Sequence, residues 1–214
     1  MRERSPARSR TSAIRADSPL LVYDLQVAIV EHVPDPQTTV ARVGQVLEAA
    51  RELGVRTFFS RHMSMPKELM GVSQLRTAMA WQRVDRVADA RSPVPAGLPG
   101  FQLISELQPR PSEAIFDKLS MSFFAGTPLD MALRDCGIVA FAIVGLVLEI
   151  GIEPTVSHGA DLGYVPIVIA DACGSVERDA RERSLASIGY SLFSHITDAD
   201  TFCRLLRAAG GAAR

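Results

Sequence analysis

The stretch from Val139 to Ser175 constrains the fold more than any other part of the sequence. It contains two continuous apolar runs, VAFAIVG and VPIVIADA, separated by about one helix length. Such runs are typical of strands buried on both faces, so the stretch predicts a β-α-β unit with parallel strands. Proline is tolerated only in the first turn of a helix, so Pro154 places the start of the connecting helix near residues 149–153.

Gly151 falls at the N-terminal end of this predicted helix, beside the carboxyl end of the preceding strand. Free backbone amides and the helix dipole favour an anion there, and open α/β sheets bind their ligands at this edge. Gly151 is therefore either part of a binding site or a glycine that permits a turn or close packing.

The same β-α-β logic occurs earlier in the chain. LLVY at 20–23 predicts a strand, Pro36 to Gly54 has apolar residues at helical spacing, and Val55 to Ser60 predicts the next strand. The repetition favours a parallel sheet with helices on both faces. Further predicted elements are a strand at Glu113–Asp117 and helices at Val72–Val87, Thr127–Cys136 with Thr127 as N-cap, Ser175–Ile188 and Asp198–Ala209.

Composition excludes several classes of protein. The 214 residues fit one domain, and the net charge of -1 gives no support to a nucleic-acid partner. No apolar run reaches the roughly 18 residues that cross a bilayer. The three cysteines are widely spaced, which argues against a disulfide framework or a zinc site and favours a reducing cytoplasm.

The segment from Met1 to Ser18 carries five arginines among serines and prolines and lacks the apolar core of a secretory signal. We expect it to be a mobile tail, with a basic contact arm as the alternative. The folded domain is then expected at residues 19–214.

Four polar or aromatic residues follow predicted strands or lie in a predicted helix. Asp24, at the end of a strand, either caps the next loop or belongs to a site. His62 is expected to be a loop residue or a substrate contact rather than a metal ligand, because no second ligand follows at close spacing. Trp81 is a core residue or a pocket wall, and an isolated Lys118 would ordinarily be a solvated surface residue.

Three blocks of sequence resemble the isochorismatase-like, or cysteine hydrolase, superfamily, which includes nicotinamidases and N-carbamoylsarcosine amidohydrolase. They are LLVYDLQ at 20–26, KLSMSFFAGTPL at 118–129, and GLVLEIGIEPTVSHGADLGYVPIVIADACGS at 145–175. The resemblance implies a three-layer α/β/α fold of Rossmann-like type with a mostly parallel six-stranded sheet. It also implies a small-molecule substrate, assembly as a homodimer or homotetramer, and no cofactor.

The resemblance also implies roles for single residues. Asp24 would be the general acid or base, Lys118 its partner cation, and the turn from Leu146 to Gly151 the oxyanion site. That turn commonly contains a non-proline cis peptide in the family, which we expect near Val147-Leu148.

One departure from the family pattern changes the expected chemistry. Gly151 stands where the amidase branches carry their nucleophilic cysteine, and glycine excludes a thioester mechanism from that position. The isochorismatase branch also has glycine there and hydrolyses a vinyl ether. Mapped onto this chain, Asp24 protonates the enol carbon, water adds, and the hemiketal collapses to pyruvate and an alcohol. Lys118 would hold a substrate carboxylate or stabilise developing charge.

The substrate itself stays open. The Gln-Pro-Gly and Trp-Gly-Pro segments of the isochorismatase branch are absent, and the sequence has SRHMS at 60–64 and AWQ at 80–82 in their place. Candidate substrate contacts are Gln26, Arg61, His62, Trp81, Phe124 and Leu148.

Two alternative functions stay open beside vinyl ether hydrolysis. The first is an amide or imide hydrolase that uses activated water or the thiol of Cys173, which sensitivity to iodoacetamide would reveal. The second is a non-catalytic family member that binds a ligand. Such a protein would be stabilised against unfolding by its ligand but would not convert it.

Overall fold

The computed structural model describes residues 18–212. Residues 1–17 of the predicted tail lie outside the described residues. Ser18, the last residue of that predicted tail, is buried next to the first strand.

Six parallel strands form one sheet in the order β3-β2-β1-β4-β5-β6. The chain therefore has the predicted α/β fold, and every strand pair is parallel. The two longest apolar runs form the neighbouring strands β4 and β5, as their hydrophobic pattern predicts. The strands are β1 (Leu20–Tyr23), β2 (Thr57–His62), β3 (Ala114–Lys118), β4 (Ala140–Gly145), β5 (Val165–Cys173) and β6 (His195–Thr197).

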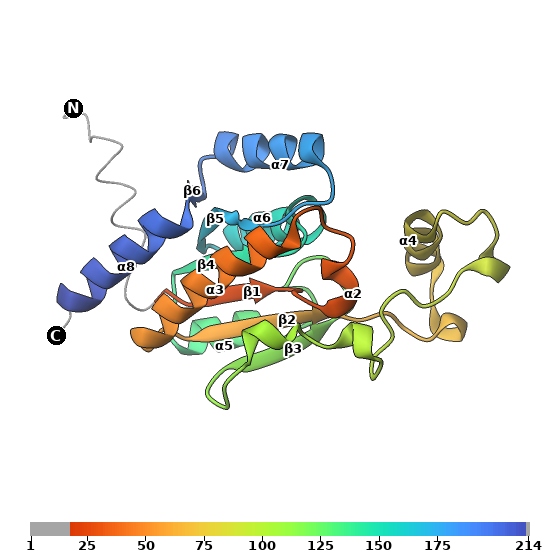
Figure 1. Ribbon diagram of the computed structural model, residues 1–214, viewed down its shortest axis with the longest axis horizontal. Helices are drawn as coiled ribbons and strands as arrows, with labels where there is room; N and C mark the ends of the chain where they lie inside the picture. Colours follow the sequence, from red (N-terminus) through yellow and green to blue (C-terminus); the bar gives the residue numbers. More distant parts are fainter. Residues whose placement is uncertain (1–17, 213–214) are drawn as a thin grey trace.

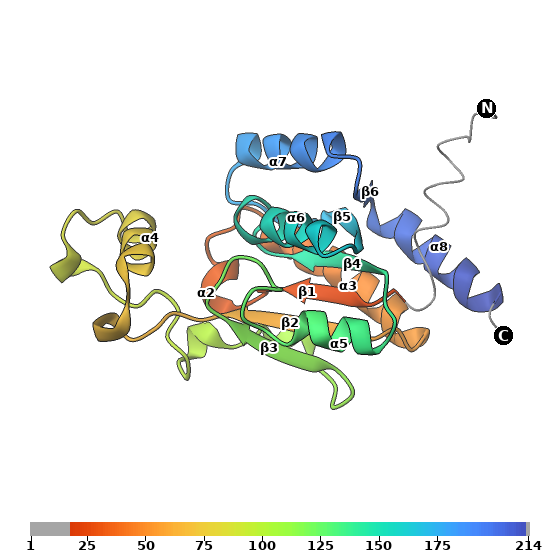
Figure 2. The ribbon, with the colours of Figure 1, turned by 180° about the vertical axis from the view of Figure 1, so that it is seen from behind.

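Helices cover both faces of the sheet and bury two separate apolar clusters (Figures 1 and 2). Alternate residues of a strand point to opposite faces, so Leu20 and Val22 pack on one side while Leu21 and Tyr23 pack on the other. The first side holds α3 (Pro36–Glu52) and α8 (Ala199–Ala212); the second holds α5 (Leu129–Asp135), α6 (Glu153–Asp161) and α7 (Arg178–Tyr190).

The connection from β2 to β3 departs from the compact body. Its helix α4 (Val72–Gln82) projects past the end of β2, as both ribbon views show (Figures 1 and 2). We expected this helix to reach Val87, but Arg83 takes a left-handed conformation with φ of 54° and ends it. The remaining short helices are α2 (Val27–Val30) and 3₁₀ turns at Lys67–Leu69, Val87–Asp89, Pro99–Phe101 and Ser105–Leu107.

Two details of the sequence-based expectations are wrong by a residue. The cis peptide joins Leu146 and Val147, not Val147 and Leu148. The N-cap of α5 is Pro128 rather than Thr127, whose hydroxyl accepts a hydrogen bond from the Leu129 amide at 3.3 Å.

The segment after β4 follows the prediction from Pro154. One turn of π-helix at Leu148–Ile152 leads into α6, and Pro154 lies in the first turn of α6, where its missing N–H is not needed. Within residues 18–212, no helix is long and apolar enough to cross a membrane.

Candidate active site

Asp24 lies at the carboxyl end of β1 and is only 3% exposed. Its backbone adopts a left-handed conformation with φ of 42°, which asparagine and aspartate tolerate better than most residues. Ser60, in β2, forms two hydrogen bonds with Asp24. Its hydroxyl accepts from the Asp24 amide at 3.1 Å and donates to Asp24 Oδ1 at 2.5 Å. The carboxylate is thereby fixed in one orientation.

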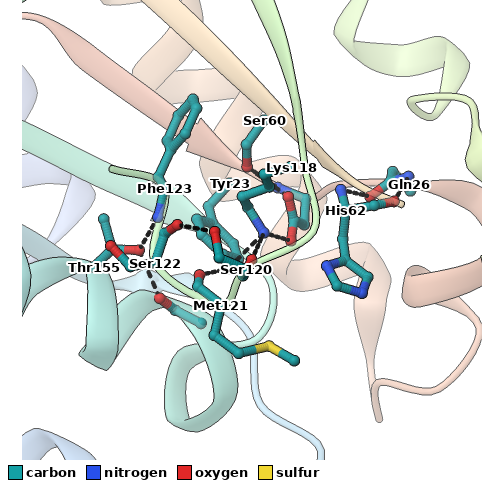
Figure 3. A network of polar contacts seen from close by, with 12 residues as sticks. Tyr23, Gln26, Ser60, His62, Lys118, Ser120, Met121, Ser122, Phe123 and Thr155 are labelled. Carbon is teal, nitrogen blue, oxygen red and sulfur yellow. Dashed lines mark hydrogen bonds and ion pairs between the residues drawn. The ribbon is translucent and has the colours of Figure 1, made fainter. Parts of the chain in front are cut away.

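Lys118 ends β3 and points toward the same place (Figure 3). Its Nζ donates to Asp24 Oδ2 at 2.6 Å, to the Tyr23 hydroxyl at 2.8 Å and to the Ser120 carbonyl at 3.2 Å. These three bonds use all three ammonium hydrogens. Lys118 is 2% exposed, so the expectation of a solvated surface lysine is wrong.

Burial is the largest influence on the pKa values of Lys118 and Tyr23. It lowers the pKa of Lys118 from its usual value, against the opposing effect of the negative charge of Asp24. Burial, then the charge of Asp24, raises the pKa of the Tyr23 phenol well above its ordinary value. Tyr23 is therefore a neutral phenol, and it donates its own hydrogen to the Met121 carbonyl.

Tyr23 also fills the space beside Gly151. A Cβ placed on Gly151 would overlap the hydroxyl and two ring carbons of Tyr23. Gly145 is equally tight, because a Cβ there would overlap the backbone of Tyr23. The two glycines let β4 and the following turn approach the end of β1, and the phenol occupies the volume where a nucleophilic side chain at position 151 would extend.

Three amides of the expected oxyanion site at residues 146–151 already have backbone partners. The Leu146 amide donates to the Tyr23 carbonyl at 2.9 Å, the Leu148 amide to the Gly174 carbonyl at 2.9 Å and the Gly151 amide to the Val147 carbonyl at 3.0 Å. All three bonds hold the backbone of this turn. An amide already bonded in this way is not free to bind an oxyanion.

A cleft of about 840 Å³ lies beside these residues. Asp24, Tyr23 and Gly151 form part of its wall, and Lys118 lies directly behind Asp24 and Tyr23. The structure therefore brings the three predicted catalytic residues together. The cleft is lined by Tyr23, Asp24, Ala28, Ile29, His32, His62, Trp81, Gln82, Arg83, Ser92, Pro93, Val94, Met121, Leu146, Val147, Glu149, Ile150, Gly151, Val176 and Glu177.

Of the six predicted substrate contacts, His62 and Trp81 line this cleft. Their rings meet edge to face, with centroids 6.1 Å apart. His62 is buried, and burial together with the charge of Lys118 lowers its pKa from 6.5 to about 4. The imidazole is therefore neutral near pH 7.

The other four predicted contacts lie elsewhere, each with a structural role. Arg61 forms an ion pair with Asp117 at 2.7 Å, because side chains alternate along β2 and residue 61 faces away from the site. Phe124 stacks on Tyr164 in the apolar core, and Leu148 is fully buried in the same cluster.

Gln26 holds the neighbouring strand rather than a ligand. Its amide nitrogen donates to the carbonyls of His62 and Phe101 at 2.9 and 2.8 Å, and its oxygen accepts from the His62 amide at 2.6 Å. This pattern satisfies the amide and fixes the backbone of His62. Gln26 therefore acts on the cleft through His62.

Cys173 does not present a reactive thiol. It is 2% exposed and lies in the core cluster, with its Sγ 3.7 Å from the Ile143 carbonyl. Burial raises the pKa of this thiol to about 12. Since the thiolate is the nucleophilic form, the geometry argues against the hydrolase that uses Cys173.

Sequence reasoning missed Tyr23 and Ser60 as site residues. Tyr23 ends an apolar run and is typical of a buried strand residue; its position next to Asp24 is the only signal of a role in the site. Ser60 is a hydroxyl inside an otherwise buried strand, which is a weak signal that a partner exists. Among residues 18–212, no group of three or more His, Cys, Asp or Glu side chains could hold a metal ion.

Comparison with known proteins agrees with this architecture. A model of the isochorismatase domain matches residues 18–201. A cysteine hydrolase from Pseudomonas syringae pv. phaseolicola shares 24% identity over 91% of this chain and 94% of its own, with a TM-score of 0.77. An isochorismatase family protein from Burkholderia thailandensis gives 22% identity, 91% and 98% coverage, and a TM-score of 0.75.

N-carbamoylsarcosine amidase from Thermoplasma acidophilum is similar at 21% identity over 86% of this chain and 97% of its own, with a TM-score of 0.68. At these identities the structures establish a shared fold. The family model, in contrast, spans most of the chain. This protein therefore belongs to the isochorismatase family of hydrolases.

Proposed function

We propose that this protein hydrolyses a vinyl (enol) ether of a small carboxylated metabolite without a covalent intermediate. The observation that carries the proposal is the Asp24–Lys118 pair in the wall of a cleft where Tyr23 leaves no room for a nucleophile at position 151. A vinyl ether needs a proton donor and a water molecule but no enzyme nucleophile. The residues in this cleft match that requirement.

The pair offers a route by which Asp24 receives the proton it must donate. Burial lowers the pKa of Lys118, which makes its proton easier to give up, and the 2.6 Å bond is the path along which this proton passes to Asp24 Oδ2 when substrate is bound. The transfer leaves a neutral amine and a neutral carboxylic acid. Asp24 then protonates the enol carbon, and its carboxylate faces the resulting oxocarbenium ion. Ser60 keeps the carboxyl group in position throughout.

The remaining steps restore the starting state. Water adds to the oxocarbenium ion, and the carboxylate of Asp24 takes the proton that this water loses and passes a proton back to the neutral amine of Lys118 behind it. The hemiketal then collapses: its hydroxyl proton moves to the leaving oxygen as the C–O bond breaks, giving a ketone and an alcohol. Protons balance over the cycle, because Lys118 regains the proton it gave to Asp24.

A substrate carboxylate needs another cation, since Lys118 already uses all three of its N–H groups. Arg83 lines the cleft and is exposed, which suits it to this role. Guanidinium groups bind carboxylates through two parallel hydrogen bonds.

The test is release of pyruvate from a panel of enolpyruvyl ethers, followed by coupled reduction with lactate dehydrogenase. We expect Asp24→Asn to lower kcat by about 10²–10⁴, the usual contribution of a general acid. Asp35→Asn is the matched control, because Asp35 is an exposed aspartate with a similar φ of 49°. In D₂O, the methyl group of pyruvate should gain one deuterium.

Three results would contradict the proposal. Asp24→Asn and Lys118→Met could each be as active as the parent, or amines could be released from amides with no pyruvate from any ether. A ligand could also raise the melting temperature without being consumed, which would indicate the non-catalytic family member.

A further inference from the structure

A second hollow, of about 170 Å³, lies next to the main cleft. It is formed where the end of β2, helix α4 and the segment after β3 meet. His62, Trp81, Pro93 and Met121 line both spaces, so the two are neighbours. The hollow is lined by His62, Met63, Ser64, Met70, Ser73, Gln74, Thr77, Ala78, Trp81, Pro93, Leu119, Ser120 and Met121.

Two buried polar atoms of this lining are unsatisfied. His62 Nδ1 and Gln74 Oε1 are inaccessible to solvent, and neither atom has a hydrogen-bond partner within residues 18–212. The Ser120 backbone acts on the imidazole as the smallest of the influences on its pKa, and the geometry leaves Nδ1 without a hydrogen bond. Folded proteins pair nearly all buried polar atoms, so each exception requires an explanation. Because His62 and Gln74 line the same hollow, one polar group bound there would satisfy both atoms.

His62 is held rigidly, so its free nitrogen is not a result of disorder. Gln26 bonds to both its amide and its carbonyl, and Trp81 packs against its ring. In Figure 3 the imidazole points away from Gln26 and Lys118. His62 as a whole is only 8% exposed, so protein atoms rather than bulk solvent surround its ring.

The lining selects a type of ligand. It contains no Asp, Glu, Lys or Arg. A charged group would therefore be buried without a counter-charge, which is strongly unfavourable. Gln74 Oε1 can only accept a hydrogen bond, so it requires a donor on the ligand. Nδ1 of the neutral His62 imidazole either donates or accepts, depending on the tautomer. An uncharged group that both donates and accepts, such as a carboxamide or a hydroxyl, meets both requirements.

The size of the hollow limits what can enter it. One water occupies about 30 Å³ of the liquid, so the hollow corresponds to roughly six waters. That volume holds a carboxamide or hydroxyl with a small apolar attachment. Met70, Trp81 and Leu119 supply apolar surface for that attachment.

We propose that the His62–Gln74 hollow is a specificity subsite that binds an uncharged carboxamide- or hydroxyl-bearing end of the substrate and rejects a carboxylate. The reactive end of the same molecule then lies in the main cleft at Asp24. Only this second statement rests on the proposed vinyl ether hydrolysis. Binding to the hollow is independent of it.

The test uses benzamide and benzoate, which have nearly the same shape and differ in charge. Each is titrated into the full chain at pH 7.5, and the imidazole signals of His62 are followed by NMR. We expect benzamide to shift them and to bind at least tenfold more tightly than benzoate. Gln74→Leu should weaken benzamide at least tenfold, while Gln37→Leu, at an exposed glutamine of α3, should leave it unchanged.

Equal binding of the two probes, or no shift of His62 up to the solubility limit, would overturn the subsite. So would unchanged benzamide affinity in Gln74→Leu. Thermal unfolding of Gln74→Leu checks that the variant is folded; we expect it to be at least as stable as the parent, because an unpaired buried acceptor is removed.

Activity separates this inference from the proposed function. Once a vinyl ether with a neutral polar end is found, Gln74→Leu should raise its KM about tenfold with little change in kcat. Selective binding of benzamide with no hydrolysis of any vinyl ether would leave the subsite standing and remove the proposed reaction. Hydrolysis of a vinyl ether without selective binding of benzamide would support the proposed reaction and remove the subsite.

Discussion

The main cleft and the smaller hollow lie side by side, but their polar groups are in opposite states. Around Asp24, both carboxylate oxygens, the phenol of Tyr23 and all three hydrogens of Lys118 have partners within the protein. Around His62, the imidazole nitrogen and the Gln74 carbonyl have none within the described chain. The first network is complete before a substrate arrives, whereas the second is completed by a ligand.

This contrast separates two tasks of a site. Proton transfer requires groups that are already oriented, because reorganisation during the reaction raises the barrier. Selection requires polar atoms that stay unpaired when the wrong molecule binds.

The strongest test of the complete network is the loss of one partner. Lys118→Met leaves the Asp24 carboxylate buried without its counter-charge, and breaking a buried pair in this way costs about 3–5 kcal/mol. Urea unfolding measures the change. The double variant Asp24→Asn, Lys118→Met should be more stable than Lys118→Met alone, because no uncompensated charge remains. A single variant as stable as the parent would show that the pair is not formed.

The pH dependence of stability probes the incomplete region. The pKa of His62 is about 4 in the folded chain and 6.5 as its ordinary value, so between these values only the unfolded chain takes up the proton. Stability contributed by the neutral imidazole is therefore fully present above pH 6.5 and is lost as pH falls toward 4. The loss is on the order of 3 kcal/mol.

Comparing parent and His62→Gln from pH 7.5 to 4 isolates this contribution. The variant should lose less stability than the parent on acidification. His32→Gln, at an exposed histidine, is the control and should follow the parent. Parallel curves for the parent and His62→Gln would show that the imidazole is accessible to protons in the folded state.

The packing of Tyr23 against Gly151 can be tested by adding one methyl group. Gly151→Ala forces overlap with the phenol, and overpacking of this kind costs about 1–3 kcal/mol. Gly44→Ala is the control, because Gly44 lies within α3 with open space where a Cβ would extend. There, alanine should stabilise the helix by about 0.5–1 kcal/mol.

A second variant makes this test specific. In a Tyr23→Val background the ring is gone, so Gly151→Ala should cost less than it does in the parent. If its cost is the same in both backgrounds, then Tyr23 is not what excludes a side chain at position 151.

The smallest effect is expected at the cysteines. Iodoacetamide should label Cys136, which is exposed, and leave Cys173 and Cys203, which are buried, unmodified in the native protein. Mass spectrometry of peptides from the labelled protein locates the modification. Cys173→Ala should retain catalytic turnover, and a loss of turnover in that variant would reinstate a thiol mechanism.

The scaffold could be predicted because its signals are local. The two apolar runs before and after residues 146–164 indicate buried parallel strands, and Pro154 indicates where the intervening helix begins. The family blocks led to Asp24, Lys118 and Gly151; Asp24 and Gly151 line one cleft, and Lys118 bonds to Asp24 from behind its wall. Helix and strand ends were less accurate, since capping at positions such as Pro128 depends on a few backbone angles.

The α/β class and the membership of the isochorismatase family could be recognised from the sequence alone, because the apolar runs and the family blocks are local patterns. Other features depend on the tertiary fold: Tyr23 fills the space beside Gly151, Gln26 holds the backbone of His62, and Arg61 and Phe124 lie outside the cleft. These facts depend on contacts between residues far apart in the chain, and periodicity along the sequence carries no information about which distant side chains meet.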